Sequence, residues 1–523
     1  MHKPKLRLQF IVTLVAMSMM SAMCSGPNGR APLSPSEMDY MTAEEPSGQL
    51  NTEEYDRVYE NPFKSPLDDP LSTFSIDVDN ASYSNVRRFL MEMGQLPPKD
   101  AVRIEEMINY FNYDYPTPKD QHPFAIQTEV MSCPWNEENK LVHIALKGRS
   151  IDLKELKGSN YTFLIDVSGS MGSPKKLGLV KTSLKMLVKS LKKEDRLAIV
   201  VYAGAAGLVL DSTPVENEKA ILQAIDQLEA GGSTAGGAGI ELAYKVAKKN
   251  FIDGGNNRII LATDGDFNIG TSSSDDLVRL IEEKRDDGIY LTICGYGMGN
   301  YKDSRMEQLS NAGNGNYFYI DNIKESRKVF LSDLTANMFT IAKDVKIQIE
   351  FNPKHVKAYR LIGYENRVMN KEDFNDDKKD AGELGAGHTV TALYEIIPTG
   401  SKSNIKSVDG LKYQSSTLTQ NARSNELMTA KLRYKAPDAN ESILIERLVE
   451  NRVKPFESTS TDQQFAVAVT GFGMLLRDSE YKGNLTYNEI VATAKKNMGS
   501  DKFGYRQEFI NMVETAELLQ EQQ

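Results

Sequence analysis

Hydrophobic positions in the central part of the chain form short continuous runs, and helical patterns separate these runs. Strands that are buried on both faces of a parallel sheet require such nearly continuous apolar runs. Between the runs, apolar residues recur every three or four positions, which is the spacing of an amphipathic helix. We therefore predict a doubly wound α/β domain with a mostly parallel sheet over residues 158–341. The four apolar runs are residues 161–165, 196–202, 258–263 and 289–295.

Strict alternation of apolar and polar residues appears on both sides of this central domain. Residues 124–130 and 142–146 alternate before it, and residues 345–351, 390–396 and 430–434 alternate after it. Alternation with a period of two is typical of strands that bury one face. We predict an antiparallel β-sandwich built from both flanks, with the α/β domain inserted in it.

The two ends of the folded region have helical patterns. Apolar residues recur at helical spacing between residues 71 and 120, and again from residue 458 to the end. Two capping boxes support the C-terminal helices, one pairing Thr461 with Gln464 and one pairing Thr486 with Glu489. Residues 25–70, in contrast, are rich in Ser, Pro, Gly, Glu and Asp, which predicts a flexible stalk.

The first residues have the pattern of an export signal. A positively charged start precedes an apolar run over residues 10–23, which is shorter than the roughly 20 residues that a membrane-spanning helix needs. The run ends at Cys24 and resembles a bacterial lipobox, in which the cysteine is lipidated. Met23 departs from the small residue usual at its position, so ordinary signal cleavage is the alternative. We expect an exported, membrane-anchored lipoprotein of the bacterial cell envelope, on a periplasmic or surface face.

These patterns divide the chain into seven segments. The segments are a signal peptide (1–24), a flexible stalk (25–70), a helical N-terminal region (71–120), sandwich strands (121–157), the α/β domain (158–341), the rest of the β-sandwich (342–457) and a helical C-terminal region (458–523).

Composition excludes some functions. The 523 residues carry a formal net charge of −10 and no basic patch, which argues against a nucleic-acid partner. Besides Cys24 the chain has only Cys133 and Cys294, and no Cys/His spacing suits zinc. The composition leaves the oligomeric state open.

Oxygen-bearing side chains follow two of the predicted parallel strands. Asp166, Ser168 and Ser170 follow the first strand, and Asp264 follows a later one. A glycine-rich segment that contains Thr234 opens the helix between them. Because ligands bind beyond the carboxyl ends of strands in such sheets, these oxygens should converge. Hard oxygen ligands of this kind suit Mg²⁺ or Mn²⁺.

The three segments together resemble the metal-ion-dependent adhesion site of von Willebrand factor A domains. The resemblance implies that a Mg²⁺ (or Mn²⁺) cofactor is held, directly or through water, and that its open position takes an Asp or Glu carboxylate from a protein partner. The implied metal ligands are Asp166, Ser168, Ser170, Thr234 and Asp264.

The flanking regions resemble a bacterial family of von Willebrand factor A lipoproteins. Residues 74–83 and 102–111 are similar to the N-terminal region of that family, and residues 472–477 and 487–491 to its C-terminal region. The resemblance covers roughly residues 70 to 520. In domains of this type, partner binding is associated with a shift of the last helix, here expected over residues 326–341. That helix either transmits binding to the sandwich or only fixes the orientation of the domain.

Three classes of function stay open at this point. The favoured one is a non-enzymatic, metal-dependent protein-binding or adhesion-like module with no catalytic residue. A metal-independent envelope scaffold is the second. A phosphoryl-transfer enzyme is the third, because Asp77 and Asp79 resemble the nucleophile turn of haloacid dehalogenase-like phosphatases. Ala81 replaces the threonine of that turn, however, so a capped turn is the better interpretation.

Overall fold

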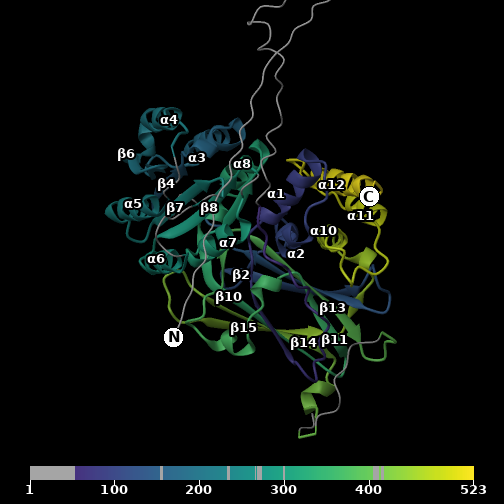
Figure 1. The fold of residues 1–523 in the computed structure, drawn as a ribbon. Helices are drawn as coiled ribbons and strands as arrows, with labels where there is room; N and C mark the ends of the chain where they lie inside the picture. Colours follow the sequence, from purple (N-terminus) through teal and green to yellow (C-terminus); the bar gives the residue numbers. More distant parts are fainter. Residues whose placement is uncertain are drawn as a thin grey trace, which may run out of the picture. The chain divides into compact units, whose positions relative to one another are not determined.

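The structure is a computed structural model that describes residues 53–152, 157–232, 236–265, 267, 274–298, 301–403, 412–413 and 417–522. Cys24, Thr234 and the predicted signal peptide lie outside the described residues. The described chain contains an α/β domain, a β-sandwich and a group of helices built from both ends of the sequence (Figure 1).

The α/β domain has a six-stranded sheet in the order β6-β5-β4-β7-β8-β9. Every neighbouring pair is parallel except β5 with the edge strand β6. This arrangement confirms the predicted doubly wound sheet and adds two strands, β6 and β9, to the four predicted ones. The strands are β4 (Ser159–Asp166), β5 (Arg196–Tyr202), β6 (Ala206–Pro214), β7 (Asn256–Thr263), β8 (Tyr290–Tyr296) and β9 (Tyr317–Ile320).

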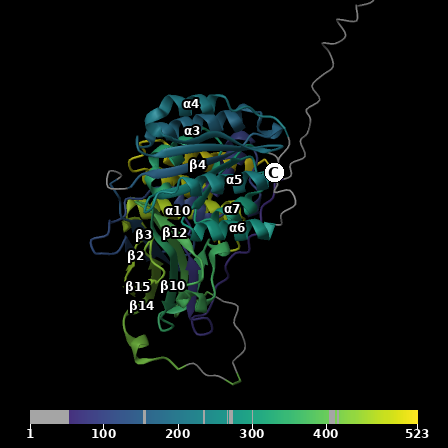
Figure 2. The ribbon, with the colours of Figure 1, turned by 90° about the vertical axis from the view of Figure 1, so that its left-hand side faces the viewer.

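Helices cover both faces of this sheet, as Figure 2 shows for α3 and α4 on one side and α5, α6 and α7 on the other. The buried face of α3 carries apolar residues at helical spacing, of which Val180, Leu184 and Leu187 are at most 1% exposed. Burial of this stripe is the main hydrophobic contribution that the helix makes to the domain. The helices are α3 (Leu179–Ser190), α4 (Glu218–Asp226), α5 (Gly236–Lys249), α6 (Ser274–Asp286) and α7 (Asp303–Ala312).

The β-sandwich consists of two five-stranded sheets that enclose an apolar core. Strand β3 precedes the α/β domain in sequence and pairs with β13, which follows it, in the register Lys140↔Ile396 to Lys147↔Thr389. This pairing confirms that the α/β domain is inserted in the sandwich. One sheet contains β1 (Leu71–Ser75), β10 (Thr340–Phe351), β12 (Gly382–Gly385), β14 (Glu426–Lys435) and β15 (Ile443–Glu450). The other contains β2 (Phe124–Ser132), β3 (Lys140–Gly148), β11 (Val356–Ile362), β13 (Thr389–Pro398) and β16 (Val453–Lys454).

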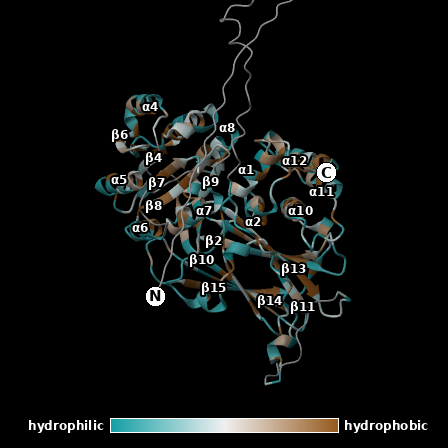
Figure 3. Cartoon of the chain, viewed as in Figure 1, coloured by the Kyte–Doolittle hydropathy of each residue, from teal (hydrophilic) through white to brown (hydrophobic). Residues whose placement is uncertain are grey.

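Helices from both ends of the sequence share one apolar core against the β11-β13-β3-β2 sheet. These helices contain both hydrophobic and hydrophilic residues in the hydropathy view (Figure 3), and many of their hydrophobic residues belong to this core. The capping box at Thr486 and Glu489 is present, whereas the first C-terminal helix is capped by Ser460 with Gln463, one residue earlier than predicted. In the part of the chain that the structure describes, none of the helices is long and apolar enough to cross a lipid bilayer. The helices are α1 (Ala81–Arg87), α2 (Ile104–Asn109), α10 (Thr461–Leu476), α11 (Tyr487–Lys496) and α12 (Tyr505–Gln520).

The stalk prediction does not hold for residues 53–64, which we call the N-terminal strap. Glu54 forms a parallel β-bridge with Lys302, and Lys64 forms an antiparallel bridge with Tyr359. Glu53 accepts two hydrogen bonds from Arg88, at 2.6 and 2.8 Å. Composition did not reveal these contacts, because the partners that order this polar segment come from distant parts of the chain. Residues 71–75, predicted as part of a helical region, likewise form strand β1 of the sandwich.

The last helix of the α/β domain is interrupted. It consists of α8 (Ile323–Arg327), a π-turn over Lys328–Ser332 and α9 (Leu334–Met338), and Asp333 lies outside all three. Strand β10 already begins at Thr340. The predicted continuous helix over residues 326–341 is therefore wrong in its extent, although the segment does lead directly into the sandwich.

A buried arginine joins the α/β domain to the helices. The side chain of Arg87 in α1 is only 4% exposed. It donates to Asp321 through Nε at 2.7 Å, to Glu325 through Nη2 at 2.7 Å and to Glu508 of α12 through Nη1 at 2.8 Å. Such an arrangement must be complete, because removal of one partner leaves buried charges uncompensated.

We expect Arg87→Met to lower the free energy of unfolding by about 3–5 kcal/mol, because the buried carboxylates of Asp321 and Glu325 lose their cation. Lys99→Met is the matched control, because Lys99 and Asp478 form an ion pair in which both side chains are about 60% exposed. The control should cost less than about 1 kcal/mol. Denaturant unfolding of both variants measures the difference, and equal losses would contradict the role given to Arg87.

Candidate metal site

Asp166 is the last residue of β4 and lies at the carboxyl edge of the sheet. Its side chain is buried and hydrogen-bonded. Oδ1 accepts from the backbone N–H of Ser168 at 2.8 Å, and Oδ2 accepts from the hydroxyl of Tyr202 at 3.1 Å. Burial raises the pKa of Asp166 to about 6, the Ser168 hydrogen bonds oppose this shift, and the charge of Asp264 adds to it. Such a carboxylate favours a nearby cation, because a cation offsets the cost of burying its charge.

The two predicted serine ligands lie together on the turn that follows β4. The hydroxyl oxygens of Ser168 and Ser170 are 3.0 Å apart. Ser168 is buried and Ser170 is exposed, so the turn reaches from the interior to the surface. The glycine-rich segment contacts this turn through its backbone, because Gly169 N–H donates to Gly232 O at 3.0 Å. The serine turn and the beginning of the glycine-rich segment, up to Gly232, therefore lie next to each other.

Asp264 reaches the same edge of the sheet from β7. Strands β4 and β7 are parallel neighbours in the register Ile165↔Ala262, which places the residues after both strands side by side. Asp264 is fully buried, and its Oδ2 lies 2.8 Å from Nζ of Lys176. No sequence pattern singled out Lys176, which follows the serine turn within a lysine pair.

The donor set at this edge fits a small divalent cation. Asp166 and Asp264 offer two buried carboxylates, and Ser168 and Ser170 offer two hydroxyl oxygens, all of them hard ligands of the kind that Mg²⁺ and Mn²⁺ prefer. One of these carboxylates already has a cationic partner, because Nζ of Lys176 donates to Oδ2 of Asp264 at 2.8 Å. Four of the five predicted ligands thus meet, and the fifth, Thr234, lies outside the described residues.

Gly265 holds the Asp264 loop against a neighbouring loop. Its φ of +97° lies in the region that favours glycine. A Cβ at this position would be 2.9 Å from the backbone nitrogen of Lys302 and from Cα of Tyr301. The loop after β7 therefore packs directly on the loop that leads into α7, and this second loop pairs with Glu54 of the N-terminal strap.

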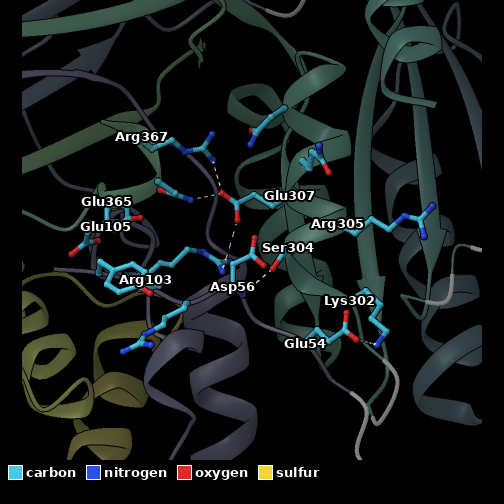
Figure 4. Close-up of a pocket in the computed structure, with 16 residues that line it drawn as sticks. Glu54, Asp56, Arg103, Glu105, Lys302, Ser304, Arg305, Glu307, Glu365 and Arg367 are labelled. Carbon is cyan, nitrogen blue, oxygen red and sulfur yellow. Dashed lines mark hydrogen bonds and ion pairs between the residues drawn. The ribbon is translucent and has the colours of Figure 1, made fainter. Parts of the chain in front are cut away.

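A separate cavity of about 800 Å³ lies between the N-terminal strap, α7 and the loop around Arg367 (Figure 4). Among the described residues, the predicted metal ligands Asp166, Ser168, Ser170 and Asp264 do not line this cavity. Charged groups of opposite sign pair along its wall, such as Arg367 with Glu307 at 3.2 Å and Lys302 with Glu54 at 2.7 Å. The cavity is therefore lined by structural ion pairs and is distinct from the candidate metal site.

Buried acids close to this cavity form a network that sequence reasoning missed. Carboxylate oxygens of Asp77, Glu106 and Glu307 lie within 4.8 Å of one another. Two guanidinium groups already bind them, because Arg103 pairs with Glu106 and Arg367 pairs with Asp77 at 2.9 Å. Burial raises the pKa of Glu106 to about 8. No short motif marks this network, because its members come from distant parts of the sequence.

The two acids of the phosphoryl-transfer alternative belong to the same network. Arg367 donates to Asp77 at 2.9 Å and to Asp79 at 3.2 Å. Asp79 also accepts from the backbone N–H of Tyr317, the first residue of β9, at 2.8 Å. Both carboxylates follow a strand of the antiparallel sandwich and are buried in ion pairs. These contacts indicate a structural role for both acids. Asp77 binds Arg367, and Asp79 links Arg367 to β9.

A doubly wound sheet with an Asp-x-Ser-x-Ser turn at its carboxyl edge defines a von Willebrand factor A-type protein. The von Willebrand factor type A domain model matches residues 160–335, a von Willebrand factor model matches residues 49–143, and the model for the C-terminal part of the uncharacterized protein YfbK matches residues 336–519. The chain is 44% identical to the uncharacterized protein YfbK of Escherichia coli (strain K12) over 475 residues, which cover 89% of this chain and 81% of that protein. The chain therefore belongs to the YfbK family.

More distant similarities cover different shares of the chain. The uncharacterized protein sll0103 of Synechocystis is 29% identical over 190 residues, which cover 36% of this chain and 44% of that protein. A solved structure described as von Willebrand factor type A from Catenulispora acidiphila is 16% identical, covers 77% of this chain and 91% of its own, and has a TM-score of 0.42. Domains of this class are typically interaction modules and not enzymes, so the chain carries a domain suited to binding other proteins.

We expect Gly265→Ala to destabilise the domain by about 2 kcal/mol, because a Cβ strains the backbone at positive φ and approaches the Lys302 backbone. Gly231→Ala, in the glycine-rich segment, is the matched control. A Cβ there has no neighbouring heavy atom within 4 Å, so the change should stay within about 0.5 kcal/mol. Thermal unfolding compares the two variants. An unchanged melting temperature for Gly265→Ala would contradict the expected strain at residue 265.

Proposed function

We propose that this protein is a divalent-metal-dependent, non-enzymatic protein-binding module of the bacterial cell envelope. The observation that supports it best is the meeting of Asp166, Ser168, Ser170 and Asp264 at one edge of the sheet, from two strands about 100 residues apart in sequence. Structural side chains at such an edge need no cluster of hard oxygen donors, whereas a Mg²⁺ or Mn²⁺ site requires one.

The side chains of the proposed site have different roles. Asp166, oriented by Ser168 N–H and Tyr202, supplies a fixed carboxylate from the interior. Ser168 is buried and Ser170 is exposed, so the proposed site extends from the interior to the surface, where a partner can approach. The bound ion would supply a Lewis-acidic position for an Asp or Glu carboxylate of a protein partner. Thr234, the fifth predicted ligand, belongs to the same proposal through the resemblance of its segment.

The metal-independent scaffold is the second candidate, and one observation favours it. Lys176 already provides Asp264 with a cation at 2.8 Å. If the site were only structural, this ion pair would satisfy the buried carboxylate without a metal. Direct measurement of metal binding separates the two candidates.

We expect wild-type protein to bind one Mg²⁺ or Mn²⁺ per chain and Asp166→Asn to abolish that binding. Asparagine keeps an acceptor for Tyr202 and removes the charge, so the fold should persist. Asp286→Ala, at an exposed position on α6, is the control and should bind as wild type does. Calorimetric titration of metal into chelator-treated protein provides the measurement. Unchanged affinity in Asp166→Asn would refute the metal assignment.

We further propose that Cys24 carries lipid and holds the protein on a membrane. Two or three acyl chains give stable anchoring, whereas one gives only marginal binding. Cys24→Ser should move the protein from the membrane fraction to the soluble fraction, and Ser25→Ala should leave it in place. Fractionation of cells that express each variant is the test. Wild-type protein found already in the soluble fraction would contradict the anchor.

A further inference from the structure

Lys176 places a partly buried positive charge at the candidate metal site. Its side chain is only 13% exposed, and its Nζ lies 2.8 Å from Oδ2 of Asp264, which is fully buried. The neighbouring Lys175 differs, because its side chain is 60% exposed and pairs with Glu92. The two adjacent lysines thus have separate surroundings, and only one of them faces the site.

The fold makes room for this lysine. A Cβ at residue 297, just beyond β8, would overlap Cγ, Cδ and Cε of Lys176, and Gly297 also has a φ of +83°. The methylene stem therefore lies across a glycine backbone on its way to Asp264. A side chain that is held in this way keeps its ammonium group near the carboxylate instead of extending it into solvent.

The charges of the site show what the lysine changes. Asp166 and Asp264 contribute −2 and Lys176 contributes +1, so these three residues sum to −1. A divalent ion would bring the sum to +1, whereas without the lysine the loaded site would be neutral. The ammonium group opposes a metal cation by repulsion and by occupying an oxygen of Asp264, and it favours an anionic group next to the bound ion.

We propose that Lys176 is an internal competitor for the metal, which weakens cation binding and keeps the loaded site positively charged for an acidic partner. This inference rests on the proposed metal function and deepens it. Lys176 acts through Asp264: an ion held by this carboxylate, directly or through water, shares the carboxylate with the ammonium group or displaces it.

The test compares metal affinity across charge variants of one position. Lys176→Met and Lys176→Gln remove the charge and retain a side chain of similar length over Gly297, whereas Lys176→Arg keeps the charge. Lys175→Met is the matched control at the exposed neighbour. Chelator-treated wild type and each variant are titrated with Mg²⁺ and with Mn²⁺ by calorimetry, and thermal unfolding confirms that each variant is folded.

We expect both neutral variants to bind the metal at least tenfold more tightly than wild type, and Lys176→Arg and Lys175→Met to stay within about threefold of wild type. If the neutral variants bind the metal and wild type shows no measurable binding, this result would also support Lys176 as a competitor. Equal or weaker binding by the neutral variants, with a wild type that binds, would overturn this inference and leave the metal function standing. If neither wild type nor the neutral variants bind, the metal function fails and the inference fails with it.

Discussion

Three largely buried arginine side chains, Arg87, Arg103 and Arg367, form ion pairs that join the α/β domain to the frame around it, which consists of the β-sandwich and the helices. Arg87 reaches Asp321 and Glu325 after β9, whereas Arg103 and Arg367 reach acids of α7. Burial of a charge costs several kcal/mol unless a partner and hydrogen bonds offset it. Apolar side chains tolerate a small slide of one surface over another, but paired charges require defined distances and angles. The ion pairs therefore restrict the inserted domain to one placement in its frame.

This placement brings the beginning of the described chain next to the candidate metal site. Gly265 allows the Asp264 loop to pack on the backbone of Tyr301 and Lys302, and Lys302 pairs with Glu54 of the N-terminal strap. The strap lies within residues 25–70, the segment predicted to be the stalk that connects the protein to a membrane. The loop that contains Tyr301 and Lys302 thus lies between the Asp264 loop of the candidate metal site and the N-terminal strap.

The sequence alone predicted four of the six strands of the α/β sheet and the placement of four candidate residues at its carboxyl edge. Buried parallel strands need continuous apolar runs, and the four runs identified in this way are β4, β5, β7 and β8. Parallel neighbours present their carboxyl ends at one edge, so the places of Asp166 and Asp264 followed from the topology. The two serines lie on the same turn as Asp166, and a contiguous motif of this kind is visible without a structure. Thr234 remains a prediction from the resemblance.

Only the tertiary structure determined the features whose partners are distant in sequence. The polar strap around Glu54 is ordered by Lys302, and the short strands β1 and β9 are stabilised by sheet neighbours that local propensity does not reveal. Lys176 looks like any surface lysine in the sequence, and its role depends on the 2.8 Å contact with an aspartate 88 positions further on. The hydrophobic pattern along a chain reports which face of an element is buried, whereas the pairing of charges depends on which elements meet. For this reason the sequence predicted the main architecture and the positions of Asp166, Ser168, Ser170 and Asp264, whereas only the folded structure showed that Lys176 lies beside Asp264.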